Sequence, residues 1–169
     1  MFWQNVKRRL TAVAILLRQA EIKGISNTAK SSYYRAATIL LCSVIEGMVY
    51  QLVKKHTNKA GNIIDKSYDH KQIHKIPNKV FGMGNEICIC EKLIKNVHID
   101  DSGVQFGKLN LYLKNNKIIN QREYRILDKV RNERNKIHLQ GLKFTDTGYT
   151  KDKVKGISKP TDFLTNKLT

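Results

Sequence analysis

The chain has 169 residues, with 31 Lys and Arg against 14 Asp and Glu, and its formal net charge is +17 at pH 7. A hydrophobic content of 41% and only two prolines exclude a disordered chain, and the length suits a single domain over residues 1–169. So basic a surface attracts polyanions, and nucleic acid is the first expected partner. A membrane surface or an acidic protein would also be attracted, and lysine can serve solubility alone.

The start of the chain imitates a secretory signal. Lys7, Arg8 and Arg9 precede an apolar run over 12–17, but Arg18 follows at once and no small-residue cleavage site appears. No segment reaches the roughly 18 apolar residues of a membrane span. The cysteines are odd in number, which fits a reducing compartment. We therefore expect a cytoplasmic protein without a membrane partner.

The first two elements are expected to be antiparallel helices over residues 2–22 and 28–56. In the first, apolar side chains recur at steps of three and four, and Gly24 provides a stop before the chain turns back. The second is the longest and most apolar element, so we place it at the centre of a bundle. The stripe of the first helix consists of Trp3, Val6, Leu10, Val13, Leu17 and Ala20.

Glu46 lies within the apolar part of the helix over 28–56. A carboxylate there is costly to bury unless it meets a cation or good hydrogen-bond donors. We expect it to pair with an arginine of the helix over 120–141. The alternative is that Glu46 emerges on the solvated side of its own helix.

The middle of the chain is the least regular part. Residues 57–85 predict a long loop with a short helix over 69–74, whose lysines either reach RNA or form an exposed insertion. A third helix is expected over 87–96, although Ile-Cys-Ile-Cys also fits a strand, because the length of the segment favours a helix. A turn over 100–103 then leads to a fourth helix over 106–114.

Three groups of potential metal ligands fall in this region. Cys88 and Cys90 are separated by one residue, which is not the common zinc spacing, and no second cysteine pair completes a tetrahedral site. His70 and His74 would share a helix face but lack a third ligand. Asp100-Asp101 fits a simple turn. We expect no metal and no other cofactor.

The helix over 120–141 carries the most informative pattern. Asn120 and Glu123 form a capping-box arrangement, and Gly141 is expected to end the helix. Arg131 and His138 are seven residues apart, about two turns, so they lie on one face. That face also holds Arg134 and Asn135, beside an apolar stripe formed by Ile126, Leu127, Val130 and Ile137.

Beyond Gly141 a turn or short extended piece precedes a last helix. Thr150 can cap that helix, and Pro160 should kink or divide it. The predicted fold is therefore all-α: a bundle of four main helices with one or two appended helices.

An arginine and a histidine on one face suit the cleavage of RNA. Arginine is a permanent cation that matches phosphate oxygens, and histidine exchanges protons near neutrality. Such a reaction needs both a proton-transfer group and a cation for the charge that develops on the phosphate. The alternative is that both side chains simply belong to a solvated, basic helix face.

The pattern Arg131-Asn132, five further residues and then His138 resembles the motif of the HEPN superfamily (higher eukaryotes and prokaryotes nucleotide-binding). Six residues between Arg131 and His138 is the upper limit of the family's spacing, and Arg134-Asn135 has the same form with a shorter spacing. The apolar helix around Glu46 is similar to a long family helix that carries an acidic residue. The resemblance covers about residues 1–141.

The resemblance implies a HEPN-like bundle and a metal-independent endoribonuclease. His138 would act as general acid or base, Arg131 would hold the scissile phosphate and Asn132 would position it. Arg134, Asn135 and Glu46 would be accessory contacts. The site would form between two subunits of a homodimer, and the protein would act as a toxin or defence effector restrained by an antitoxin or a nucleotidyltransferase partner. The alternative that the family offers is a non-catalytic module that binds RNA or a protein.

Overall fold

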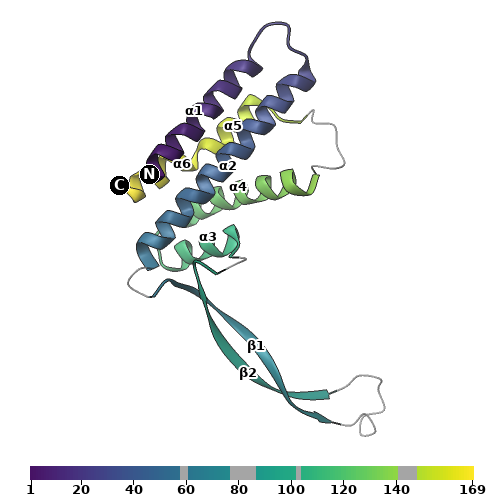
Figure 1. Cartoon of the computed structure of the whole chain (residues 1–169), viewed down its shortest axis with the longest axis vertical. Coiled ribbons are helices and arrows are strands. Elements are labelled where there is room, and N and C mark those ends of the chain that lie inside the picture. Colours follow the sequence, from purple (N-terminus) through teal and green to yellow (C-terminus); the bar gives the residue numbers. More distant parts are fainter. Residues whose placement is uncertain (58–60, 77–86, 102–103, 141–147) are drawn as a thin grey trace.

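The computed structural model describes residues 1–57, 61–76, 87–101, 104–140 and 148–169. A body of packed helices carries a long two-stranded ribbon that projects from one end (Figure 1). We call this ribbon the arm. Its presence overturns the predicted all-α fold, because the described chain is a mixed structure of helices and one antiparallel sheet.

Helices α1 (Phe2–Ala20) and α2 (Asn27–Thr57) form the predicted antiparallel pair. Between them Gly24 adopts a left-handed backbone with φ of 86°, which glycine tolerates without a side-chain clash. The hydroxyl of Ser26 then accepts a hydrogen bond from the backbone N–H of Ala29 and supports the start of α2. On α1, Val6, Val13 and Ala20 are buried, as the spacing predicts, whereas Trp3 of the same predicted stripe is 41% exposed.

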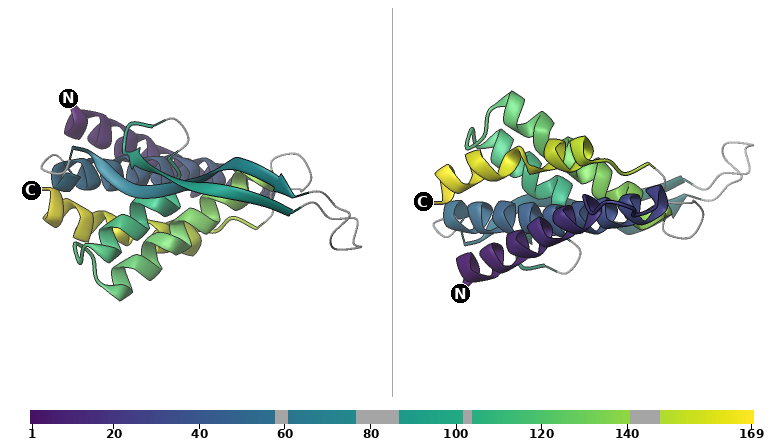
Figure 2. Two further views of the ribbon diagram at one scale, coloured as in Figure 1. Left: turned by 90° about the horizontal axis from the view of Figure 1, so that it is seen from below. Right: turned by 90° about the horizontal axis from the view of Figure 1, so that it is seen from above.

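Helix α2 is the centre of the body, because every other helix packs against it. It lies between α1 and the C-terminal helices (Figure 2). By length and composition α2 could also cross a membrane. The expectation that no segment is long and apolar enough for a membrane span was therefore wrong by these two criteria. However, 56% of the stretch that meets this test is buried inside the structure, as in the core helix of a soluble protein.

The arm consists of β1 (Ile63–Ile76) and β2 (Ile87–His98), paired antiparallel from Ile63 opposite His98 to Ile76 opposite Ile87. The register shifts between Ile63 and Asp65 and between Gln72 and His74. The predicted helices over 69–74 and 87–96 were both wrong. Each segment satisfies its backbone N–H and C=O groups on the other one, and a pattern read within one segment cannot detect this non-local pairing.

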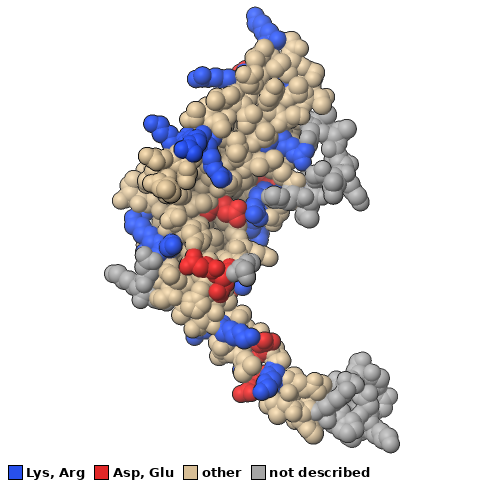
Figure 3. All heavy atoms as spheres, in the orientation of Figure 1, with Lys and Arg blue, Asp and Glu red and all other residues tan. Residues whose placement is uncertain are grey.

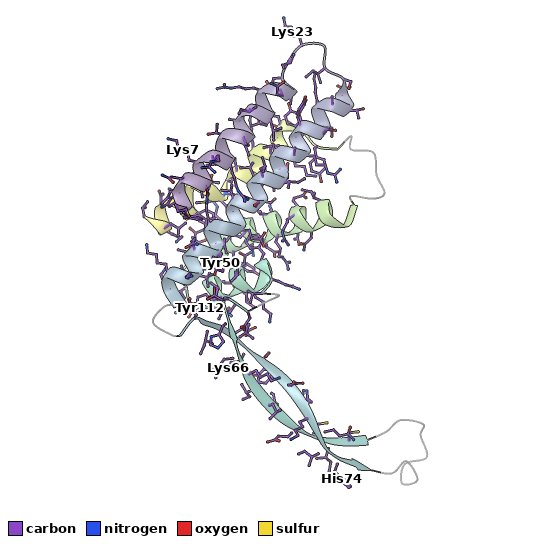
Figure 4. All side chains as sticks on the ribbon, in the orientation of Figure 1. Lys7, Lys23, Tyr50, Lys66, His74 and Tyr112 are labelled. Atoms are coloured by element: carbon purple, nitrogen blue, oxygen red, sulfur yellow. The ribbon has the colours of Figure 1, made fainter. Side chains whose placement is uncertain are left out.

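The arm is anchored at its base and exposed along its length. Ile64 and Ile99 are buried in the core of the body, and the N–H of Ile99 donates to the carbonyl of Asn62 at 2.9 Å. Tyr50 and Tyr112 lie near this base, and His74 lies near the far end (Figure 4). Tyr68, Ile73, Ile89 and Ile94 are all more than half exposed.

The remaining helices are α3 (Phe106–Asn115), α4 (Gln121–Gln140), α5 (Lys151–Ser158) and α6 (Pro160–Leu168). The predicted capping box of α4 is present: Asn120 Oδ1 accepts from the N–H of Glu123 at 2.9 Å, and Glu123 Oε2 accepts from the N–H of Asn120 at 2.8 Å. The Thr150 hydroxyl caps α5 by accepting from the N–H of Lys153. Pro160 divides α5 from α6, as expected.

One hydrophobic core joins the helical body, with contributions from each of the six helices in the described part of the chain and from the base of the arm. Its largest fully buried side chains come from α2, α3, α4 and α6. The segment over 141–147, which includes the expected stop at Gly141 and most of the piece that follows it, lies outside the described residues, as do residues 58–60, 77–86 and 102–103.

Candidate functional site

Helix α4 is oriented by its apolar residues, which place the predicted site face at the edge of the core. Leu127, Val130 and Ile137 are buried. Arg131 and Arg134 follow on the side of α4 that meets α2 and the start of α3. Both arginine side chains are about a third exposed, at 37%. They are therefore open to a ligand while their stems pack against the body.

Arg131 reaches toward the N-terminus of its own helix, as the tilt of helical side chains requires. Its Nη2 lies 2.8 Å from Asp128 Oδ1, one turn earlier, and 3.4 Å from Asn132 Oδ1. Its Nε is shielded from solvent and has no hydrogen-bond partner among the described residues. Part of the guanidinium is thus satisfied within the helix, and part is left without a partner.

The guanidinium of Arg131 also lies against the first turn of α3. A Cβ added at Gly107 would come within 3.1 Å of Nη1, so glycine provides the room for this approach. The N-cap of α3, Gln105, forms no side-chain capping bond. A cation beside the positive end of a helix is unfavourable by itself, and Asp128 offsets that charge.

Arg134 and Glu46 connect α4 to α2. Arg134 Nε lies 3.1 Å from Glu46 Oε2, so the expected pairing of Glu46 with an arginine of this helix is present. The Glu46 side chain is 31% exposed, which means that it lies at the boundary between core and solvent rather than fully on either side. The carboxylate avoids the cost of an unpaired buried charge through this contact.

These side chains surround a cavity of about 380 Å³ at the junction of α2, α3 and α4, which we call the α3–α4 cavity. Arg131, Arg134 and Asn135 enter it from α4, and Glu46 enters it from α2. The remaining wall is the segment over 104–107 at the start of α3. A second cavity of about 240 Å³, beside Cys42 and Ile137, shares Glu46 and Arg134 with the first.

Two predicted catalytic residues are not placed in this cavity by the described contacts. Helix α4 extends to Gln140 and so includes the backbone of His138, two turns beyond Arg131, but the His138 side chain lies outside the described residues. Asn132 is exposed, and its Nδ2 donates to Asp128 Oδ2 at 3.4 Å. It lines a groove on another side of α4 and meets the cavity only through its contact with Arg131.

The sequence analysis missed the contribution of α3. Gly107 and its neighbours line the cavity, and Asp128 holds Arg131, yet neither was predicted as part of the site. The Asp128–Arg131 spacing of three residues is an ordinary helical ion-pair signal and could have been recognised. The approach of α3 depends on packing between segments and has no local signal.

The potential metal ligands do not converge among the described residues. No group of three or more His, Cys, Asp or Glu side chains in this part of the chain is placed to hold a metal ion. His70 and His74 lie on a strand, with a register shift between them, and not on one helix face. Cys88 and Cys90 are exposed on the arm, whereas burial raises the pKa of the Cys42 thiol to about 12.

On the face shown in Figure 3, basic side chains are distributed over the body and the arm, and acidic side chains lie in the middle of the body, near its junction with the arm and along the arm itself. Comparison with known proteins adds no assignment: no protein family, no curated protein and no solved structure matches the chain.

Proposed function

We propose that the protein is a metal-independent endoribonuclease of the HEPN type, with its site at the α3–α4 cavity. The observation that carries the proposal is the convergence of Arg131, Arg134 and Asn135 on one solvent-accessible cavity. Two guanidinium groups and an amide are suitable donors for the oxygens of a phosphodiester. The high positive charge of the chain supports a polyanionic substrate.

In the proposed reaction the ribose 2′-hydroxyl attacks the adjacent phosphorus and loses its proton. The bond from phosphorus to the 5′-oxygen breaks, and that oxygen receives a proton, so the products are a 2′,3′-cyclic phosphate and a 5′-hydroxyl end. His138 exchanges these protons, and Arg131 with Arg134 stabilises the charge on the phosphate oxygens. Asn132 orients Arg131 through its 3.4 Å contact. DNA is not a substrate because it lacks the nucleophile.

The arginines must exchange partners when the phosphate binds. Asp128 and Glu46 hold them in the free chain, at 2.8 Å and 3.1 Å. A phosphate would draw the guanidinium of Arg131 away from Asp128 and provide a partner for its unsatisfied Nε. The second candidate is a non-catalytic HEPN-like module that binds RNA or a protein. The same ion pairs favour it, because an arginine that is already paired with a carboxylate can stabilise the fold without taking part in a reaction.

The site is proposed to be shared between two subunits of a cytoplasmic homodimer. Arg131 points toward the N-terminus of α4, away from the position of His138 on the same helix. The Arg131 of one subunit would therefore serve a phosphate together with the His138 of the other. A toxin or defence role, restrained by an antitoxin or nucleotidyltransferase partner, is consistent with such an enzyme.

The test is incubation of the purified protein with labelled RNA in the presence and absence of EDTA, followed by analysis of the product ends. We expect cyclic phosphate and 5′-hydroxyl ends in both conditions, and no cleavage of the matching 2′-deoxy substrate. Arg131→Ala and His138→Ala should each abolish cleavage. Arg122→Ala is the matched control, since it removes the same charge from a different side of α4. RNA binding without cleavage by the unaltered protein would support the non-catalytic module instead.

Sharing of the site is tested by mixing the two inactive variants. Light scattering should report about twice the chain mass of 19.5 kDa. A mixed dimer of one Arg131→Ala chain and one His138→Ala chain retains a single composite site with both groups, so measurable cleavage should return. A monomer that retains cleavage would contradict the shared site.

A further inference from the structure

A groove of about 920 Å³ runs between α4 and α5, and of its lining residues the proposed reaction uses only Asn132. We call it the α4–α5 groove. Its α4 wall includes Arg125, Ile126, Lys129 and Lys136, and its other wall is formed by α5 and the residue that follows it, Lys159. The groove is more than twice as large as the α3–α4 cavity, at about 380 Å³.

The groove is strongly cationic. The basic side chains that line it are Arg122, Arg125, Lys129, Lys136, Lys153 and Lys159. The acidic residue among its lining residues, Glu133, is already engaged: its two carboxylate oxygens lie 3.0 Å from the Nζ atoms of Lys136 and Lys153. Burial disfavours the ionised Glu133, but these two lysines together outweigh it and lower the pKa of the carboxyl. An anionic ligand would meet several cations that no groove carboxylate neutralises.

The floor of the groove is aliphatic. Its apolar lining residues, Ile126, Val130 and Ile157, are all aliphatic, and lysine and arginine side chains can add their hydrocarbon stems to such a surface. Gly156 lies within α5 on this floor, where a Cβ would meet no atom within 4 Å. Glycine inside a helix lowers the stability of the helix by roughly 0.5–1 kcal/mol relative to alanine. Gly156 therefore leaves space open above the groove floor and makes α5 less stable than alanine would.

The groove is separate from the proposed catalytic site. Lys129 and Lys136 lie about 140–160° around α4 from Arg131, if each residue turns the helix by about 100°. The two cationic sets therefore face different directions, and one short ligand cannot occupy both. A ligand of the groove would therefore be distinct from the RNA bound at the proposed catalytic site.

The lining favours a protein ligand over RNA. Proteins that hold single-stranded nucleic acid usually stack its bases on aromatic side chains, and none of the described groove residues is aromatic. An amphipathic helix presents aliphatic side chains in a stripe with charged residues on either side, which matches an aliphatic floor between cationic walls.

We propose that the α4–α5 groove binds an acidic amphipathic helix of a partner protein. The partner's leucine-like side chains would lie on Ile126 and Ile157 and enter the space over Gly156. Its carboxylates would meet the lysines and arginines of the two walls. The proposal does not depend on RNA cleavage, because it rests on the groove alone.

The test uses fluorescence anisotropy with the full chain and a labelled synthetic helix of about 21 residues, three heptads long, with Leu at the buried positions and Glu beside them. We expect saturable binding that weakens as salt rises, because the contacts between carboxylates and lysines are screened. A peptide of the same composition with its leucines distributed around the helix, and a peptide with Lys in place of Glu, should both bind at least about tenfold more weakly.

Two variants locate the binding. Gly156→Leu should fill the space on the floor without strain, keep the circular dichroism spectrum, and weaken peptide binding by about tenfold or more. Lys129→Glu with Lys136→Glu should also abolish most binding. The double change Lys7→Glu with Lys66→Glu is the matched control, because it alters the net charge equally at two lysines, one on α1 and one on the arm, that do not line the groove (Figure 4).

Equal binding of the acidic helix to Gly156→Leu, or an equal loss in the control variant, would overturn the proposal. Displacement of the peptide by a short single-stranded RNA that itself loses affinity in Gly156→Leu would assign the groove to nucleic acid. Failure of RNA cleavage with intact peptide binding would reject the proposed enzyme and leave the docking site in place.

Discussion

Arg131 and Gly107 are in close approach: a side chain of even one carbon at Gly107 would lie 3.1 Å from Nη1 and 3.4 Å from Cδ of the arginine. The start of α3 therefore sets the position of a guanidinium that belongs to α4. If Arg131 holds the scissile phosphate, the glycine is a positioning residue for the reaction.

Gly107→Ala should accordingly reduce RNA cleavage while the protein remains folded. The added methyl displaces the flexible end of Arg131, and a shift of about 1 Å in a catalytic group can cost up to about 100-fold in rate. The free energy of unfolding should change by less than about 1 kcal/mol, because only a partly exposed, flexible side chain has to move. Cleavage assays and urea unfolding measure the two effects.

Gly156→Ala is the matched control for that experiment. It adds the same methyl within another helix, where no atom lies within 4 Å of the new carbon. Cleavage should not change in this variant. An unchanged rate in Gly107→Ala as well would remove Arg131 from the reaction.

Replacement of Glu46 by glutamine should strengthen RNA binding. The change removes the carboxylate that lies 3.1 Å from Arg134, so one more free cation faces the α3–α4 cavity. Affinity for a labelled RNA should rise. The plot of the logarithm of affinity against the logarithm of salt concentration should become steeper by about one unit, as expected for one additional phosphate contact. Stability should fall by no more than about 1 kcal/mol, because the pair is partly exposed.

The control for Glu46→Gln is Glu21→Gln, which breaks the ion pair with Lys151, away from the cavity. The two variants carry the same net charge. An equal gain in affinity from both would indicate a general effect of charge and no specific role of the cavity.

Arg134→Ala should slow cleavage less than Arg131→Ala. Loss of one phosphate contact costs about 1–3 kcal/mol of transition-state stabilisation, which is roughly 5- to 150-fold in rate. Single-turnover kinetics of both variants on one RNA substrate would measure the difference. A larger loss from Arg134→Ala would transfer the principal phosphate contact to that residue.

The three thiols should react at very different rates. Cys88 and Cys90 are exposed on the arm, whereas Cys42 is buried and its pKa is raised to about 12 by burial. At pH 8 the reactive thiolate of Cys42 is almost absent. Titration with a thiol reagent should modify two cysteines in the native protein and the third only after unfolding. Because the pKa is higher in the folded state, the contribution of this thiol to stability is present below about pH 9 and is lost as the pH rises toward 12.

The arm should exchange its amide hydrogens faster than α2. A two-stranded ribbon buries little apolar area, and an isolated hairpin is marginally stable. Hydrogen exchange with mass spectrometry should show protection at Ile64 and Ile99, which are buried in the core, and faster exchange toward Gln72 and Cys90. Strong protection throughout the arm would indicate that another chain covers it in solution.

Local sequence determined most helices of the body. The reciprocal hydrogen bonds of Asn120 and Glu123 start α4, and Pro160 separates α5 from α6, as their residue types predict. The pairing of Glu46 with an arginine of α4 was also predictable. A carboxylate in an apolar helix requires a cation, and α4 offers arginines beside its apolar stripe.

Tertiary structure alone decided the arm and the shape of the cavity. The segments over 63–76 and 87–98 become strands because each completes the backbone hydrogen bonds of the other. Taken alone, the sequence of the first segment also fits a loop and that of the second also fits a helix. Gly107 belongs to the candidate site only because α3 packs against α4 in the folded chain. Capping and periodicity act within a few residues of the chain, whereas strand pairing and helix packing join residues that are distant in sequence, so their outcome depends on the whole fold.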